Sequence, residues 1–278
     1  MRVPMGWLNE FVEIPIPVAD LAERLTFAGL EVASIETLGL PGSALPWDRE
    51  RMLVGSILEV KPHPNADRLV LACVDYGAGR IKTVVTGAPN LKVGDRGQKV
   101  AFALEGARVR DAYSATPGVV TLTGRKVRGV YSDGMVLSEK ELGLSDDHEG
   151  VLLLDEAAPV GVPLADYLGE TVLELEILPN MARCLSILGV AREVAALTGS
   201  RVRVPEPAMA AAGPPVGERV QIEIADPSLC ARYTATLITG VAIAPSPEWM
   251  RRRLRLAGIR PISNVVDVTN YVMLEWGQ

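Results

Sequence analysis

The sequence predicts a multidomain α+β protein in which a small β-barrel lies between an N-terminal α/β segment and a C-terminal mixed α/β region. The main observation is a series of five short apolar runs separated by Gly, Pro, Asn and Asp clusters. Evenly spaced short strands of this kind are typical of a closed or nearly closed barrel. Helical patterns flank the series on both sides, and 278 residues suffice for about two domains, at one per ~100–200 residues.

The expected barrel is locally basic. Its strands are predicted over 52–60, 70–75, 81–86, 98–103 and 119–123. Between residues 51 and 142 there are 14 Lys and Arg against 9 Asp and Glu, a net charge of +5, whereas the whole chain carries −6 and the remainder therefore −11. Because cationic side chains gain affinity by displacing counterions from phosphates, the barrel is a candidate nucleic-acid module. The acidic remainder confines any RNA contact to that module.

The N-terminal segment, residues 1–40, is expected to be small and ordered. Apolar residues recur at i, i+4 and i+7 over 18–28, which predicts a helix there. Gly29 suits the left-handed residue that ends such a helix. Residues 30–36 are expected to be extended, and a Pro- and Gly-containing loop then leads into the barrel.

Beyond the barrel the pattern alternates between strands and helices. Strands are predicted over 151–154, 173–177, 219–224 and 232–243. Asn180 is predicted to be the N-cap of a helix that ends at Gly199, because an Asn side chain can accept from a first-turn N–H group. A further helix is predicted to begin with Ser246 as N-cap and Pro247 at its first position.

The composition excludes several other classes of protein. No apolar run reaches the roughly 18 residues that a membrane span needs, and the N-terminus lacks the apolar region of a secretory signal. Cys73, Cys184 and Cys230 are odd in number and far apart, which argues against a disulfide framework. They and the two histidines offer no close-spaced zinc ligands. The sequence therefore predicts a protein of the reducing cytoplasm without a metal site.

Four motifs follow one another in the barrel region. They are His63-Pro-Asn-Ala-Asp-Arg-Leu69, Val74-Asp75, Gly87-Ala-Pro-Asn90, and Gly129 to Gly143 with its Ser132-Asp-Gly-Met135 core. In this order they resemble the tRNA-binding OB-fold family, which occurs in several tRNA synthetases and in free-standing proteins. The resemblance implies that the barrel is of the OB type and binds tRNA.

Segments outside the barrel resemble a more particular family. They are Val3 to Leu8 with 25–32, 179–194, and the C-terminal stretch 260–278. They resemble the N-terminal part of the beta subunit of bacterial phenylalanyl-tRNA synthetases. Met181 stands where that family has Arg, and Arg183 stands where it has Asp. An ion pair or cap that those family residues make is therefore not expected here.

The resemblance implies a division into three parts. Residues 1–40 would form the N-terminal segment, 41–150 the tRNA-binding OB-fold domain, and 151–278 a partial editing domain of the B3/B4 type. Residues 205–217, which hold four prolines and two glycines, are expected to be a surface linker or a loop within that editing domain.

The resemblance also implies the reaction of the whole enzyme. The family joins phenylalanine to its tRNA with ATP and Mg²⁺, in an assembly of two alpha and two beta subunits, and most of that chemistry lies in the alpha subunit. No cofactor is expected on this part of the chain. The sequence therefore predicts part of an aminoacyl-tRNA ligase subunit that binds the phenylalanine tRNA.

The resemblance places Thr269 and Asn270 in an editing pocket that hydrolyses tyrosine wrongly esterified to this tRNA. An apolar pocket rejects an added hydroxyl by only about 10²-fold, whereas a site that hydrogen-bonds the hydroxyl discriminates by about 10⁴–10⁵-fold. The alternative for both residues is a helix-surface or cap role. Because the family's signature continues past Gln278, the chain alone is expected to be inactive in deacylation.

Five barrel residues are candidates for tRNA binding: His63, Arg68, Arg125, Lys126 and Arg128. The last three place three cations within four residues, which suits a phosphate contact, and a solvated turn is the alternative. His63 lies between prolines and could touch RNA or bond to local backbone. Arg68 could instead pair with its neighbour in sequence. Because the barrel has few aromatic residues, we expect contacts to the shape and backbone of folded tRNA rather than base stacking.

A stand-alone RNA-binding or interaction protein without enzymatic activity is the alternative class. The changed charges at Met181 and Arg183 favour it, because a paralogue that uses only its barrel would not need the editing residues. The reading frame beyond codon 278 would separate the two, since a ligase subunit continues for several hundred residues.

Overall fold

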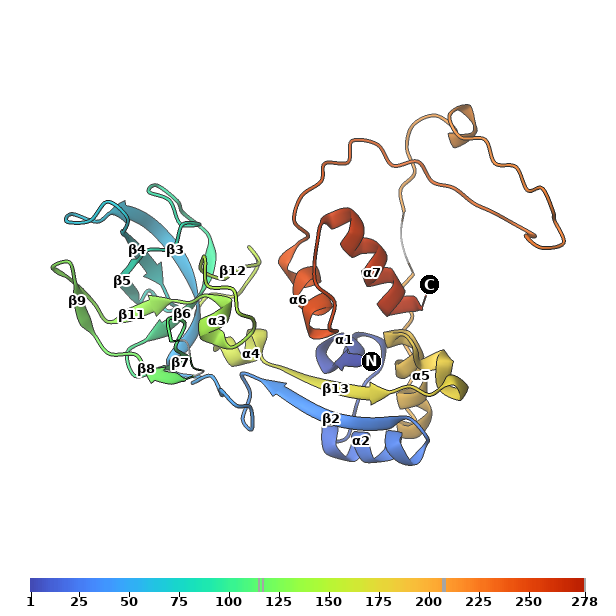
Figure 1. Ribbon diagram of the computed structural model, residues 1–278, viewed down its shortest axis with the longest axis horizontal. Helices are drawn as coiled ribbons and strands as arrows, with labels where there is room; N and C mark the ends of the chain where they lie inside the picture. The colour runs from blue at the N-terminus through green and yellow to red at the C-terminus, as the bar shows by residue number, and fades with distance from the viewer. Residues whose placement is uncertain (115, 117, 207–208, 278) are drawn as a thin grey trace.

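The computed structural model describes residues 1–114, 116, 118–206 and 209–277, and it has two compact parts (Figure 1). One is the β-barrel, and the other is a sheet with helices. The long strands β2 (Glu31–Leu38) and β13 (Glu170–Glu176) run from the barrel into the second part.

The helices are α1 (Met5–Phe11), α2 (Val18–Phe27), α3 (Glu139–Leu142), α4 (Leu164–Leu168), α5 (Ile187–Thr198), α6 (Glu248–Leu256) and α7 (Asn264–Trp276), with 3-10 turns at Pro179–Cys184 and Val216–Glu218. The remaining strands are β1 (Arg2–Pro4), β3 (Met52–Pro62), β4 (Val70–Asp75), β5 (Ile81–Thr86), β6 (Lys99–Leu104), β7 (Arg108–Arg110), β8 (Val119–Thr121), β9 (Arg125–Val127), β10 (Val130–Ser132), β11 (Gly134–Val136) and β12 (Leu153–Leu154).

The sheet-and-helix unit is built from residues on both sides of the barrel. Its three strands are antiparallel in the order β1-β13-β2, with Val3 opposite Leu173 and Ile35 opposite Leu173 on the other side. One buried core joins side chains of α1, α2, β13 and α5. The barrel is therefore an insertion between β2 and β13. The division at residues 40 and 150 stays a prediction, but the predicted strand over 173–177 packs with the N-terminal segment.

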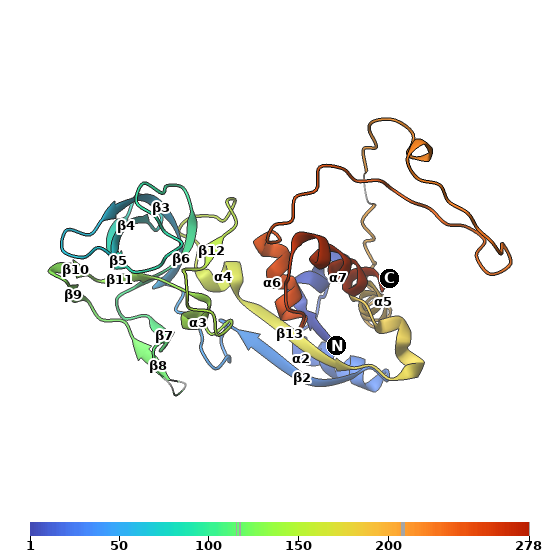
Figure 2. The same cartoon turned by 45° about the horizontal axis from the view of Figure 1, so that its top comes forward.

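The barrel is nearly closed, as predicted. Its strands are ordered β11-β6-β3-β4-β5, and β12 adds to β6; Figure 2 shows β3, β4, β5 and β6 arranged around the axis. On the open side of the barrel no ladder joins β5 to β11 among the described residues, and the Val85 N–H of β5 instead donates to the Oγ of Ser132, which ends β10 just before β11, at 3.1 Å. Gly77 lies so close to Gly161 that an added Cβ would approach the Gly161 Cα to 2.5 Å, which fixes glycine at this crossing.

Four of the five predicted barrel strands are confirmed by β3, β4, β5 and β6. The fifth, over 119–123, is a strand but lies outside the barrel: β8 pairs with β7 in a separate hairpin. Its place is taken by β11, which pairs with β6. This strand has three residues and begins with Gly134, whose added Cβ would lie 2.9 Å from the Ala103 carbonyl oxygen. A short glycine-containing strand gives no apolar alternation, so the sequence did not reveal it.

Both predicted N-caps after the barrel are wrong. Asn180 lies inside the 3-10 turn and caps nothing; α5 begins instead after Ser186, whose Oγ accepts from the Gly189 N–H at 3.0 Å. Ser246 Oγ donates to the buried Asp267 at 2.6 Å, and Pro247 is the N-cap of α6. Gly199 does end α5, with a φ of +76°.

The strands predicted over 219–224 and 232–243 are wrong. Among the described residues of 200–245 the backbone forms no sheet, and most side chains there are exposed. An apolar alternation becomes a strand only where another edge supplies its hydrogen bonds, and neither range has such a neighbour. The predicted linker, 205–217, is exposed where described, and its residues 207–208 lie outside the described residues. No helix among the described residues is long and apolar enough to cross a membrane.

Helices α6 and α7 return to the sheet-and-helix unit through a cluster that we call the aromatic anchor, consisting of Trp7, Trp249, Arg253 and Tyr271. The Trp7 and Tyr271 rings stack with centroids 4.7 Å apart. Arg253 lies over both tryptophan rings and donates to the Tyr271 hydroxyl at 2.7 Å. Trp7 is buried, and its Nε1 donates to Glu275 at 3.0 Å. The anchor holds α7 against α1, which lies beside it in Figure 1.

Candidate nucleic-acid interface

Two loops of the barrel are fastened together on one side. His63, in the loop between β3 and β4, is only 6% exposed, and its Nε2 lies 3.2 Å from the Val127 carbonyl oxygen. Its Nδ1 accepts from the Asn65 N–H at 3.1 Å, and Asn65 Nδ2 donates to the Arg128 carbonyl at 3.0 Å. OB folds bind oligonucleotides at the loops that correspond to this pair. The backbone reading of His63 is therefore the one that the geometry supports.

The fastened hairpin, β9-β10, presents the predicted cations. Arg125, Lys126 and Arg128 are exposed, and none has a carboxylate within 4.0 Å among the described residues. Arg128 has a left-handed φ of +48°, which costs free energy for a residue with a Cβ and is held by the Asn65 contact. Arg68, in the other loop, is also exposed and unpaired within the described part of the chain. The alternative, a pairing of Arg68 with Asp67, is not present among the described residues.

Some other cations of the barrel are paired with carboxylates. Arg96 and Lys61 both contact Glu59, at 2.9 and 3.2 Å, and Lys82 pairs with Asp133. Among the described residues, Arg80, Lys92 and Arg108 are also exposed without a carboxylate partner, but they lie apart along the chain, whereas the two fastened loops hold four such cations on adjoining segments. A phosphate that approaches these loops does not have to break an internal ion pair.

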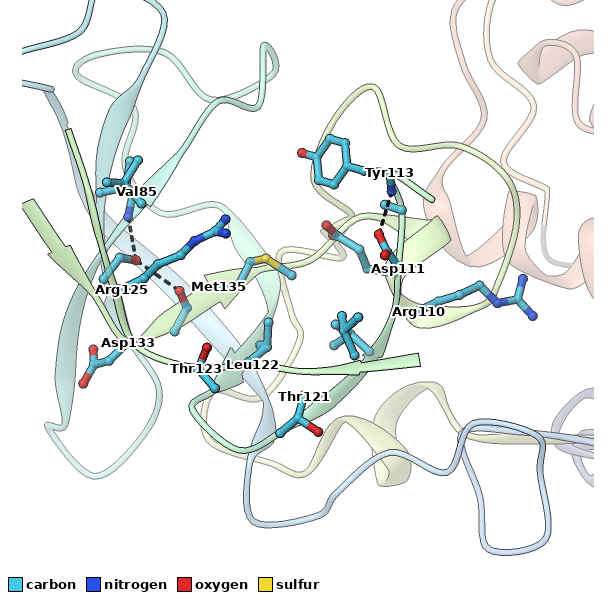
Figure 3. A pocket seen from close by; sticks show the side chains of 17 residues that line it. Val85, Arg110, Asp111, Tyr113, Thr121, Leu122, Thr123, Arg125, Asp133 and Met135 are labelled. Carbon is cyan, nitrogen blue, oxygen red and sulfur yellow. Dashed lines mark hydrogen bonds between the residues drawn. The ribbon is translucent and has the colours of Figure 1, made fainter. Parts of the chain in front are cut away.

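A cleft of about 330 Å³ lies beside the hairpin, between β7-β8 on one side and the Arg125–Met135 region on the other (Figure 3). Its floor contains the half-buried side chains of Leu122 and Met135. In Figure 3, Arg125 extends toward Met135, whereas Arg110 points away from it. The ring of Tyr113, which is 89% exposed, lies on the β7-β8 side. The sequence does not predict this cleft, because its lining comes from separate turns that only the fold brings together.

The arginine-rich helix α6 is not a second basic surface. Arg251 pairs with Glu248 at 2.8 Å, Arg255 with Glu139 at 3.1 Å, and Arg253 with Glu10. Arg252 donates to the Leu168 carbonyl at 2.8 Å and lies 3.8 Å from Glu170. These contacts reach the barrel and the N-terminal unit, so the charges of α6 fix it in place.

The predicted editing residues lie on α7. Thr269 is exposed, and its Oγ1 donates to the Val266 carbonyl at 2.7 Å. This hydrogen bond agrees with the helix-surface role, which is the alternative given for Thr269 above. Asn270 is half-buried and precedes Tyr271 of the aromatic anchor. The two residues are about 140 positions from the barrel hairpin along the chain and lie on a different part of the molecule (Figure 1).

The two departures from the family pattern have structural partners. Met181 is buried in the core of the sheet-and-helix unit. Arg183 lies at the surface, and its Nε donates to Glu193 at 2.7 Å, so the changed charge is paired. Cys184 is buried beside them, and burial raises the pKa of its thiol, which favours an inert small apolar side chain over a nucleophile. Among the described residues no group of His, Cys, Asp and Glu side chains could hold a metal ion.

The nearly closed barrel between β2 and β13 defines the class: a protein with a small OB-like barrel inserted into a sheet-and-helix unit. Residues 52–163 match the tRNA binding domain family, and residues 229–278 match the B3/4 domain family. The whole chain is 48% identical to the phenylalanine–tRNA ligase beta subunit of Dehalococcoides mccartyi strain CBDB1, 46% to that of Moorella thermoacetica, and 42% to that of Salinibacter ruber. The resemblance is confirmed: the similarity to the phenylalanine–tRNA ligase beta subunits extends over the whole chain, which spans about a third of their length, 33–34%.

Proposed function

We propose that this chain is the tRNA-binding and partial editing portion of a phenylalanine–tRNA ligase beta subunit. The observation that carries the proposal is the hairpin β9-β10, which His63 and Asn65 hold in place while its cations stay unpaired within the described residues. Together with the matches to the tRNA binding and B3/4 families, this arrangement favours a ligase subunit. Nothing in the comparisons favours the stand-alone interaction protein.

The contact with tRNA is electrostatic. Four unpaired cations, Arg68, Arg125, Lys126 and Arg128, would neutralise about four phosphates, and the logarithm of the binding constant then falls with a slope of roughly −3.6 against the logarithm of salt concentration. Binding by this chain is therefore weak and drops by about 10²-fold between 50 and 200 mM salt.

The test measures tRNA binding by fluorescence anisotropy over a salt series. Replacing Arg125 and Lys126 by Ala should weaken binding and reduce the salt slope by about 2, because two phosphate contacts are lost. Arg96→Ala is the matched control, since Arg96 is an exposed barrel cation that already pairs with Glu59. An affinity for tRNA that stays constant across the salt series would contradict the proposal.

Within the whole subunit, Thr269 and Asn270 contribute to the site that hydrolyses tyrosine esterified to the phenylalanine tRNA. Their support is the B3/4 match, which covers both residues, and the aromatic anchor that orients α7. The whole enzyme uses ATP and Mg²⁺ and pairs with an alpha subunit in an assembly of two alpha and two beta subunits.

Replacing Asn270 by Ala in the full-length ligase should slow deacylation of tyrosyl-tRNA at least ten-fold and leave phenylalanine charging unchanged. Val268→Ala, an exposed neighbour on α7, serves as the control. Equal deacylation by the Asn270 variant and the control would remove Asn270 from the editing site.

A further inference from the structure

The cleft beside the hairpin β9-β10 has an apolar floor, which distinguishes it from a solvated gap between turns. Leu122 and Met135 each pack one side against a buried cluster of β3, β6, β7 and α4 side chains and leave the other side open to the cleft. Val120, on β8, adds a side chain that is 42% exposed. A monomer gains free energy by covering such surfaces, so an apolar floor beneath a polar rim indicates a ligand with a flat apolar face.

The rim of the cleft carries groups that suit a nucleotide. Arg125 extends over the floor in Figure 3 and has no carboxylate partner among the described residues. A guanidinium in this position can bind a phosphate with two parallel hydrogen bonds. Thr121 and Thr123 place exposed hydroxyls along the same edge, where they can donate to or accept from a base or ribose. The exposed Tyr113 ring offers a second flat surface on the opposite side.

Size and charge select the occupant. A volume of about 330 Å³ accommodates one nucleotide and excludes a double helix. An apolar side chain of a protein partner would also fit the floor, but the unpaired cations on the adjoining hairpin attract a polyanion. The three carboxylates of the lining are already bonded within the chain: Asp111 to the Tyr113 and Ser114 N–H groups, Asp133 to Lys82, and Glu141 to Ser138. We propose that the cleft binds one unstacked nucleotide of a single-stranded RNA segment, with the base on Leu122 and Met135 and a phosphate at Arg125. This inference rests on the proposed function, because it places one base of the bound RNA.

The proposal extends the expectation drawn from the sequence. The small number of aromatic residues predicts binding to shape and backbone, and those contacts remain with the cations of the hairpin. The cleft adds one base contact, made mainly by aliphatic and thioether side chains, which composition does not reveal.

The experiment compares a single-stranded 12-nucleotide RNA with an RNA hairpin duplex of the same charge, using the 278-residue chain. Thr123→Trp fills the cleft from an exposed position and leaves the core untouched. It should weaken binding of the single strand by about five-fold or more, the loss expected for one stacked base, and change duplex binding by less than two-fold. Arg125→Ala should weaken both, because the phosphate contact serves either RNA.

Ser34→Trp, an exposed replacement on β2, is the matched control, and equal urea midpoints for the variants would show that they are folded. The inference is overturned if Thr123→Trp binds the single strand as tightly as the unmodified chain, or if both RNAs are weakened equally. If the unmodified chain binds neither RNA at low salt, the proposed function falls along with it.

Discussion

His63 contributes to the candidate interface by hydrogen-bonding to the backbone of both barrel loops. Its Nδ1 accepts from the Asn65 N–H, so its Nε2 carries the proton that is donated to the Val127 carbonyl. Both ring nitrogens are therefore used within the loop pair, and neither remains for a ligand. A histidine between two prolines gives the sequence no means of separating these roles, because Val127 is 64 positions away and only the fold brings it near.

The pKa values of two glutamates at the contacts of the sheet-and-helix unit, Glu248 and Glu36, are shifted in opposite directions. Burial raises the pKa of Glu248, although Arg255 and Arg251 act the other way. The hydrogen bond from Arg2 lowers the pKa of Glu36 despite some desolvation. The ionised form of Glu248 is therefore a cost at neutral pH, whereas the ionised form of Glu36 is a gain.

The pH dependence of stability should separate these two residues. A raised folded pKa contributes stability below the ordinary value of 4.5 and loses it as pH rises, so Glu248→Gln should keep or raise the urea midpoint at pH 7 and lose that advantage below pH 4.5. Glu36→Gln should lower stability at pH 7 by about 0.2–1 kcal/mol, since its pair is exposed, and match the unmodified chain at low pH. A loss for Glu248→Gln at pH 7 as large as that for Glu36→Gln would refute this balance.

The helices and strands that the sequence predicts correctly are those whose signal is complete within a short stretch of residues. The helix predicted over 18–28 is α2, and four barrel strands coincide with β3 to β6, because periodic apolar residues and turn residues fix them locally. The strands predicted over 219–224 and 232–243 fail because a strand is completed by a neighbour that the local sequence does not specify. The cleft was missed for a similar reason, since its floor joins the β8 end to β11.

The start of α5 provides a test at this scale. Ser186→Ala should destabilise the chain by about 1 kcal/mol, since the Gly189 N–H loses its acceptor near a buried helix start. Asn180→Ala should change stability by less than about 0.5 kcal/mol, because the Asn180 side chain caps no helix. Urea unfolding of the two variants decides between Ser186 and the cap predicted from the sequence; a larger loss for Asn180→Ala would favour the latter.

At the scale of the whole molecule, the aromatic anchor joins segments that the chain separates by more than 240 positions. Arg253 and Glu10 are 243 residues apart, and Trp7 and Glu275 are 268 apart. The described residues between 203 and 245 contribute little to either core and run outside both compact parts (Figure 2). Helices α6 and α7 are thus held by their own contacts and not by the segment that leads to them.

Limited proteolysis tests whether α6 and α7 are held by their own contacts. Trypsin is expected to cut first after the exposed Arg219 and Arg232, because the backbone there forms no sheet or helix. The fragment from residue 233 onward should stay with the rest of the chain in gel filtration. Arg253→Ala should release it, since that residue contacts Glu10, Trp7 and Tyr271. The double variant Arg219→Gln and Arg232→Gln is the control, because it should resist the first cuts. Release of the fragment from the nicked unmodified chain would count against the aromatic anchor.

The insertion of the barrel between β2 and β13 imposes an order on folding during synthesis. Strands β1 and β2 emerge from the ribosome early, yet the strand that lies between them is made about 130 residues later, or roughly 7–26 s at ~5–20 residues per second. The barrel can fold within that interval from its own contiguous sequence. Until β13 arrives, the first two strands lack their central partner, so the growing chain presents unpaired β edges to chaperones while the RNA-binding part is already formed.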